Sequence, residues 1–282
     1  MSRVPLISAH RGGAGTDRAR ENTLGALREA PTTGCEFVEF DVQRCRDGVF
    51  VVHHDRFLRE GRRQVPIASL TFEEFAARAG AYLLLDDVLA ELRGRTRVHL
   101  DLKFLTEVAE VAGTDPPAPR QEVALVAHIV DVMGVDNVVV TGLRDESVAA
   151  VRAWSRDRLP GLLVGLSLSR DVGLRGLRML LTGRFDEVLP GRRLRACDAN
   201  LVVCQRTQAR LWGARWARRR GLPLLVWTVD RPEELRSWLA DGRAWMVTTN
   251  FPRQAVELRR RLAAAAEDAD TGADADAADA VP

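Results

Sequence analysis

Two carboxylates on one predicted strand, followed by a histidine, are the residues of this sequence best suited to chemistry. Glu39 and Asp41 lie two positions apart in segment 37–43 (FVEFDVQ), where apolar residues alternate with polar ones. Side chains at i and i+2 of a strand share a face, so the two carboxylates lie side by side and repel each other unless a cation or a proton intervenes. His54 follows the next short apolar segment. Together these residues suit metal-assisted acid/base chemistry.

Taken one at a time, these residues also have ordinary structural explanations. An acidic residue in a strand is usually solvated or ion-paired, and a lone histidine is usually structural. The functional interpretation depends on polar residues that follow other predicted strands. The apolar run at 4–9 (VPLISA) leads into the sequence HRGG, and segment 97–103 (RVHLDLK) places Asp101 and Lys103 on one face. Parallel α/β proteins present their sites at such carboxyl ends of strands.

The elements that must position these residues alternate between strands and helices. We predict strands at 4–9, 37–43, 97–103, 137–141, 162–168, 201–204, 222–229 and 245–249. Helices are predicted at 24–30 (capped by Asn22 or Thr23), 71–80, 83–92, 120–133, 145–155, 171–181, 207–220, 232–240 and 252–264. Short strands that alternate with helices favour a parallel sheet, and eight such units in about 250 residues match an α/β fold of the TIM-type (β/α)8 barrel class. A small hairpin at 48–55 is expected as an insertion after the second strand, because Arg-Asp-Gly precedes it as a turn sequence.

Composition divides the chain into a barrel domain at 1–262 and a disordered acidic Ala/Asp-rich tail at 263–282. The tail holds six acidic residues and no Lys or Arg, which leaves 41 basic against 33 acidic side chains in the rest of the chain. Such a tail has too few large apolar residues to form a core. The positive charge of the domain suits a small anionic substrate. Nucleic acid is not expected as a partner, because the basic residues are not interleaved with aromatic ones.

The cysteines and the N-terminus indicate an intracellular protein. Cys35, Cys45, Cys197 and Cys204 have no metal-binding spacing, so we expect free thiols. No apolar run is long enough to cross a bilayer. The N-terminus lacks the charged and apolar regions of a signal peptide, and a cytoplasmic location is therefore expected. Contact with a membrane is expected only through a lipid substrate, and the sequence does not indicate an oligomeric state.

Seven motifs, in their order along the chain, resemble those of the glycerophosphodiester phosphodiesterase family. They are His10-Arg11-Gly12, Glu21-Asn22-Thr23, Glu39-Phe40-Asp41, Val51-Val52-His53-His54-Asp55, Asp101-Leu102-Lys103, Trp227-Thr228-Val229 and Thr248-Thr249-Asn250-Phe251-Pro252. The resemblance covers residues 4–260. It implies a (β/α)8 barrel that hydrolyses glycerophosphodiesters to glycerol phosphate and an alcohol.

The resemblance also implies a role for each site residue. Glu39, Asp41 and Asp101 would bind one divalent cation, and their oxygen donors suit Mg²⁺ or Ca²⁺. The resemblance implies catalysis for His10 and His54, phosphate binding for Arg11 and Lys103, and lining of the pocket for Trp227. Glu21 would support either Arg11 or the groups around the metal. On an extended chain His53 and His54 face opposite sides, and the motif selects His54.

Three positions depart from the family pattern. Asp101 stands in place of a Glu, Arg20 in place of a Pro, and Asn250 where an Asp is frequent. The shorter Asp101 leaves open a non-catalytic barrel that binds phosphodiesters, which an assay with and without chelator separates from an enzyme. A lysophospholipase D-type hydrolase that acts on lysophospholipids is the other alternative, and a panel of substrates separates it from the first interpretation.

Overall fold

Eight parallel strands close into a barrel in the computed structural model, which describes residues 4–104, 120–168 and 190–278. The barrel strands are β1 (Leu6–Ala9), β2 (Phe37–Arg44), β6 (Arg97–Leu102), β7 (Val138–Gly142), β8 (Leu163–Leu168), β9 (Leu201–Gln205), β10 (Leu224–Trp227) and β11 (Met246–Thr249). β1 pairs in parallel with both β2 and β11, and this closes the sheet. The predicted α/β barrel of the TIM type is confirmed, and each predicted barrel strand is present.

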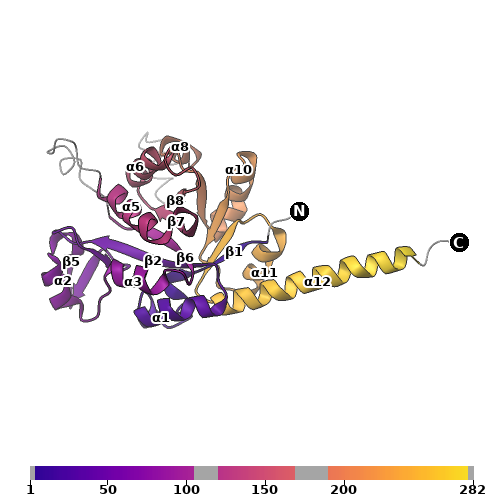
Figure 1. Ribbon diagram of the computed structural model, residues 1–282, viewed down its shortest axis with the longest axis horizontal. Helices are drawn as coiled ribbons and strands as arrows, with labels where there is room; N and C mark the ends of the chain where they lie inside the picture. Colours follow the sequence, from indigo (N-terminus) through magenta and orange to yellow (C-terminus); the bar gives the residue numbers. More distant parts are fainter. Residues whose placement is uncertain (1–3, 105–119, 169–189, 279–282) are drawn as a thin grey trace.

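Helices lie around the outside of the barrel (Figure 1). They are α1 (Leu24–Glu29), α3 (Leu85–Leu92), α5 (Gln121–Met133), α6 (Asp145–Ser155), α8 (Pro190–Ala196), α9 (Arg206–Gln208), α10 (Ala214–Arg219), α11 (Pro232–Asp241) and α12 (Pro252–Ala278). The predicted helix at 207–220 is interrupted by a π-helical turn, Ala209–Gly213, between α9 and α10. Thr23 caps α1, because its hydroxyl accepts a hydrogen bond from the Ala26 amide. The predicted helix at 171–181 lies outside the described residues.

The two faces of the barrel strands pack in different ways. The outward side chains form a large apolar layer with the helices, which includes Ile7, Phe40, Leu100 and Val140. The inward side chains fill the barrel where its strands begin, through Phe37, Val139, Leu201, Val203, Leu225 and Met246. Such filling is typical of TIM-type barrels, whose interior is a packed core and not a pore.

Closer to the carboxyl ends of the strands, the inward side chains become polar. The register places Glu39 of β2 opposite His99 of β6, and Asp41 opposite Asp101. Asp101 in turn lies opposite Thr141 of β7. Directly paired residues of parallel strands point to the same face, so the register gathers these polar side chains at one end of the barrel.

The insertion after β2 is larger than the predicted hairpin. Besides β3 (Phe50–Val52), which pairs antiparallel with β2, it contains the hairpin of β4 (Phe57–Glu60) and β5 (Arg63–Pro66) and the helix α2 (Phe72–Ala79). Its own apolar cluster consists of Cys45, Val51, Leu58, Val65, Ile67, Leu70 and Phe75. The hairpin β4–β5 escaped prediction because each of its strands buries only one residue, which is too short a pattern to detect.

At the C-terminus the structure differs from the prediction made from the sequence. The helix α12 continues to Ala278, whereas a disordered tail was predicted from residue 263 onward. Alanine has the highest helix propensity, and the acidic composition of this segment concealed that preference. The start of α12 is anchored, because Ala255 and Val256 are buried and Arg259 pairs with Glu36 at 2.7 Å. Figure 1 shows the helix then projecting away from the barrel.

Two further expectations concern the thiols and the membrane. Cys35, Cys45, Cys197 and Cys204 are all free and buried, as predicted. Among the helices in the described part of the chain, none combines the length and the apolarity needed to span a bilayer.

Gly165 tests the close packing inside the barrel. A methyl group at Gly165 in β8 would lie 2.4 Å from a Val203 methyl group and 3.1 Å from Leu201. We expect Gly165→Ala to lower the free energy of unfolding, measured by chemical denaturation, by about 1–3 kcal/mol. Gly25→Ala in α1 is the control, because the added methyl group meets nothing within 4 Å. It should leave the stability unchanged or raise it by up to about 1 kcal/mol. Equal stability of the two variants would contradict the packing argument.

Candidate active site

Three carboxylates from two neighbouring strands meet at the polar end of the barrel. One oxygen from each of Glu39, Asp41 and Asp101 lies within 4.8 Å of the other two. Glu39 is only 3% exposed and Asp41 only 1% exposed. Oxygen atoms in such a group are the donors that hard divalent cations prefer.

Asp41 is surrounded by groups that favour its charged form. Lys103 Nζ lies 2.9 Å from one carboxylate oxygen of Asp41, and Arg11 Nε lies 3.1 Å from the other. Asn22 Nδ2 also donates a hydrogen bond of 2.8 Å to Asp41. Burial alone would raise the pKa of Asp41, but the charges of Lys103 and Arg11 hold it well below its usual value. Lys103 also pairs with Asp101, and the two carboxylates raise the pKa of Lys103 against the effect of its burial.

Glu39 is held by a backbone amide. It accepts a hydrogen bond of 2.7 Å from the Arg11 amide, and no ion pair of Glu39 occurs among the residues that the structure describes. Burial and the nearby charges of Asp41 and Asp101 raise the pKa of Glu39 well above its usual value. The cluster therefore favours additional positive charge. Its three carboxylates provide the oxygen donors that suit a divalent cation such as Mg²⁺ or Ca²⁺.

The sequence HRGG forms a tight turn, η1 (His10–Gly12), that brings two side chains into the barrel mouth. Arg11, Gly12 and Gly13 have positive φ angles of 47°, 84° and 72°. A Cβ atom on Gly13 would lie 2.5 Å from Pro252, so this position requires glycine for space as well as for conformation. The turn leaves the Arg11 guanidinium beside Asp41 and bonded to Glu21 at 2.5 Å.

His10 is held by a polar chain that begins at Asp230. Asn250 Nδ2 donates to Asp230 at 2.8 Å, which turns the amide oxygen of Asn250 toward His10 Nδ1, also at 2.8 Å. Because this oxygen can only accept, Nδ1 carries the proton and Nε2 has a free lone pair. Burial and the charge of Arg11 lower the pKa of His10, although the bond to Asn250 acts in the opposite direction.

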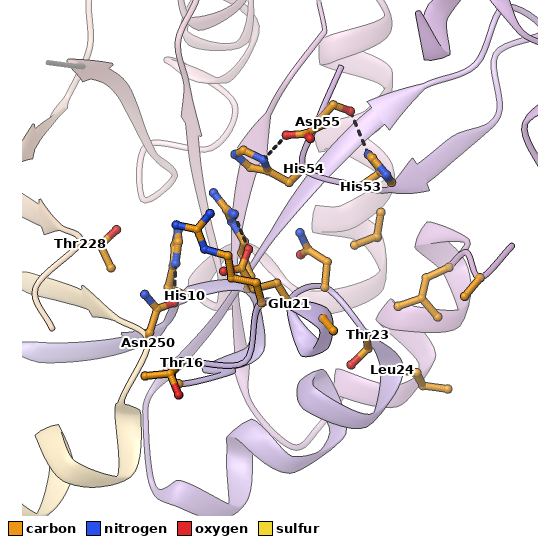
Figure 2. A pocket seen from close by; sticks show the side chains of 18 of the residues that line it. His10, Thr16, Glu21, Thr23, Leu24, His53, His54, Asp55, Thr228 and Asn250 are labelled. Atoms are coloured by element: carbon orange, nitrogen blue, oxygen red, sulfur yellow. Dashed lines mark hydrogen bonds and ion pairs between the residues drawn. The ribbon is translucent and has the colours of Figure 1, made fainter. Parts of the chain in front are cut away.

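His54 lies in a different environment from that of His10. Its Nδ1 is 2.8 Å from a carboxylate oxygen of Asp55, and its side chain is 40% exposed. The Nδ1 atoms of the two histidines therefore have different partners, a carboxylate at His54 and an amide oxygen at His10. Figure 2 shows His54 and Asp55 on one side of the pocket, and His10 and Asn250 on the other.

His53 lines the wider cleft but not the inner cavity, where His54 lies. Its Nδ1 lies 2.9 Å from the Asp55 carbonyl oxygen. Its ring packs edge-on against Phe75 of the insertion, with 6.1 Å between the ring centroids. His53 therefore contributes to the packing of the insertion.

The predicted site residues line one cavity of about 160 Å³ at the barrel mouth. They are His10, Arg11, Glu39, Asp41, His54, Asp101, Lys103 and Trp227. The wall opposite the carboxylates is formed by Val203, Leu225, Trp227 and Thr248. A wider cleft of about 1180 Å³ shares His10, Arg11 and His54 with this cavity and extends between Thr16, Tyr82 and Phe251. Small ligands can thus reach the charged cavity from an open cleft.

Sequence reasoning missed several residues that support the site. Asn22 donates a hydrogen bond to Asp41, and Asp230 holds Asn250, which in turn contacts His10. Asn22 and Asn250 belong to the motifs named above, but no role in the site was predicted for them, because their contacts join segments distant in the sequence. His99 also lines the cavity, and its alternation with Asp101 and Lys103 along segment 97–103 is the sequence signal that places it on the same face.

Comparisons with known proteins agree with this geometry. The glycerophosphoryl diester phosphodiesterase family matches residues 10–153, which is just over half of the chain. The chain is 24% identical over 264 residues to the glycerophosphodiester phosphodiesterase of Caldanaerobacter subterraneus subsp. tengcongensis, with 91% of this chain and 98% of that protein covered. It is 41% identical over 69 residues to a lysophospholipase D of Mus musculus, with 24% of this chain covered. The chain spans only 20% of the length of that mouse relative.

A solved structure supports the fold. The crystal structure of glycerophosphodiester phosphodiesterase from Thermotoga maritima superposes with a TM-score of 0.64 at 20% sequence identity, and 92% of this chain and 100% of that chain are covered. The extent of the family match, together with the ordered motifs that line one cavity, shows that this chain belongs to the glycerophosphoryl diester phosphodiesterase family.

Proposed function

We propose that the protein is a metal-dependent phosphodiesterase that hydrolyses glycerophosphodiesters to glycerol phosphate and an alcohol. The observation that carries this proposal is the meeting of three carboxylates, two cationic side chains and two histidines in one cavity. Family membership and the name of the Caldanaerobacter relative support the reaction class. A cytoplasmic location belongs to the same proposal and is supported by four free thiols, which persist in reducing compartments.

Positive charge is the first contribution of the site to this reaction. Glu39, Asp41 and Asp101 would hold the cation, which when bound offsets the charge that develops on the phosphoryl oxygens. Arg11 and Lys103 border the same cavity and provide fixed positive charge toward the phosphate. Their ion pairs with Asp41 keep both side chains in place before substrate binds.

Proton transfer is the second contribution, and the two histidines suit opposite directions of transfer. His10 has its lone pair on Nε2 and a lowered pKa, so it is suited to accept a proton from the attacking hydroxyl group. His54 borders the same cavity, held at Nδ1 by the carboxylate of Asp55, and takes the opposite role of donating a proton to the leaving alkoxide. Trp227 lines the cavity opposite the carboxylates and would border the organic part of the substrate.

A lysophospholipid is a second candidate substrate for the same chemistry. The open cleft beside the catalytic cavity is lined in part by Leu24, Leu83, Tyr82 and Phe251, which offer apolar surface to an acyl chain. The name of the mouse relative is consistent with this candidate. Turnover of glycerophosphocholine compared with its mono-acylated counterpart distinguishes the two substrates. The non-catalytic alternative loses support, because the shorter Asp101 still reaches the other carboxylates.

The first prediction from the proposed function concerns the cation. Chelator should abolish hydrolysis of glycerophosphodiesters, and added Mg²⁺ or Ca²⁺ should restore it. Asp41→Asn should raise the metal concentration required for half-maximal activity by about tenfold or more, because a neutral amide is a weaker ligand for a hard ion. Asp157→Asn removes an exposed carboxylate on the surface and should behave like the parent. Full activity in a metal-stripped sample would refute the metal dependence.

The second prediction concerns the histidines. His10→Ala and His54→Ala should each lower kcat by about a hundredfold or more, the scale of a lost acid or base. His53→Ala should retain most activity, because its ring packs against Phe75. These kcat values are to be measured at saturating cation. Similar losses at positions 53 and 54 would show that the assignment of these two neighbours is incorrect.

The third prediction concerns Lys103, the only lysine in a chain whose other 40 basic residues are arginines. Its ammonium group fits between Asp41 and Asp101, where the side chain is only 11% exposed. A guanidinium is wider, planar and forked. Lys103→Arg should therefore lower kcat/KM by about tenfold or more although the charge is kept, and Lys103→Ala should lower it further.

Arg218→Lys is the control, because it also exchanges one basic residue type for the other but at an exposed position. Its kcat/KM should equal that of the parent. Circular dichroism should show normal folding of all three variants. Parent-like turnover by Lys103→Arg would mean that the shape of the cation is unimportant, and parent-like turnover by Lys103→Ala would remove Lys103 from the site.

A further inference from the structure

A chain of three hydrogen bonds crosses the inside of the barrel and ends on Asp101. Ser8 Oγ in β1 lies 3.2 Å from His99 Nδ1 in β6. His99 Nε2 lies 3.1 Å from Thr141 Oγ1 in β7. Thr141 Oγ1 then lies 2.8 Å from one carboxylate oxygen of Asp101, and Lys103 holds the other oxygen. Both oxygens of Asp101 are thus engaged, one by Thr141 of β7 and the other by Lys103, which follows β6.

Burial shields this chain of hydrogen bonds from water. Ser8 is 0% exposed, His99 is 4% exposed and Thr141 is 2% exposed. Water does not compete for these polar atoms, so each depends on its neighbour for a partner. Both ring nitrogens of His99 are occupied by hydrogen bonds to Ser8 and Thr141. His99 is therefore not suited to transfer protons to a substrate, in contrast to His10 and His54.

The chemistry of the end groups fixes the direction of every bond. The ionised carboxylate of Asp101 only accepts, so Thr141 donates to it. Thr141 is also 3.5 Å from the Leu100 carbonyl oxygen, but the bond to Asp101 is far shorter. Because the hydroxyl has a single proton, Thr141 must accept from His99 Nε2–H. His99 Nδ1 is then the acceptor, and Ser8 donates to it.

We infer that Ser8, His99 and Thr141 are positioning residues that set the orientation of the Asp101 carboxylate and thereby the affinity of the site for a divalent cation. This inference rests on the proposed function, in which Asp101 is a ligand. A carboxylate on a free side chain rotates about two bonds and must be ordered when the cation binds. Partners that hold it beforehand reduce that cost, which is how residues behind the ligands tune metal sites.

The first test measures cation binding without substrate. Thr141→Val keeps the branched shape but removes the hydroxyl, whereas Thr141→Ser keeps the hydroxyl. Calorimetric titration of metal-stripped protein with Mg²⁺ and with Ca²⁺ should show about tenfold to hundredfold weaker binding for Thr141→Val, and binding within about twofold of the parent for Thr141→Ser.

Ser155→Ala is the control for the loss of a buried hydroxyl away from the cavity. Ser155 in α6 is fully buried, and its hydroxyl has no hydrogen-bond partner in the part of the chain that the structure describes. Its cation affinity should equal that of the parent. Ser8→Ala, at the far end of the chain of bonds, should weaken binding in the same direction by about twofold to tenfold. This second variant tests the inference even if Thr141→Val fails to fold.

A second test reads the proton on His99 directly. In ¹⁵N-histidine-labelled, metal-free protein, the His99 signals, assigned by their loss in His99→Gln, should report a neutral ring with the proton on Nε2. A proton on Nδ1 instead would reverse the direction of these hydrogen bonds, because Thr141 would then donate to His99 and not to Asp101. That result would overturn the inference. Parent-like cation affinity in Thr141→Val and Ser8→Ala would also overturn it. If the parent protein binds neither cation, the proposed function fails, which is a distinct result.

Discussion

The mutual repulsion of buried carboxylates is the constraint on which the rest of this site depends. Two charges about 4 Å apart interact by about 4 kcal/mol at the effective dielectric typical near a protein surface. Glu39, Asp41 and Asp101 are held at about that separation. Arg11 and Lys103 offset part of the charge from opposite sides of Asp41. The left-handed backbone conformation at Arg11 brings both its guanidinium group and its backbone amide to the carboxylate cluster.

A closed barrel is what allows so much polarity to be buried. The barrel interior is apolar and closely packed where the strands begin, so the backbone is rigid at the level where the polar side chains start. The upper layer is then ordered by hydrogen bonds across strands, in which a residue from β6 is held by one from β7 and another from β1. Rigid strands and satisfied partners together keep charged groups close without collapse of the cavity.

The sequence predicted what depends on local periodicity and failed where distant segments meet. Alternation identified Glu39, Asp41, Asp101 and Lys103, because residues two apart on a strand share a face. The bond from Asn22 to Asp41 depends on how a loop folds back over a strand, which periodicity does not encode. The helical C-terminus was mistaken for disorder, since the acidic side chains concealed the preference of alanine for helix.

The insertion between β2 and α3 has a consequence for the diversification of this protein. It has its own small core, and it also provides His53, Arg59 and Tyr82 to the wall of the open cleft. The charged groups that carry the proposed chemistry belong to the barrel, with the exception of His54 at the junction. Sequence changes within the insertion can therefore reshape the entrance to the cleft, while the charged groups at the barrel mouth keep their positions.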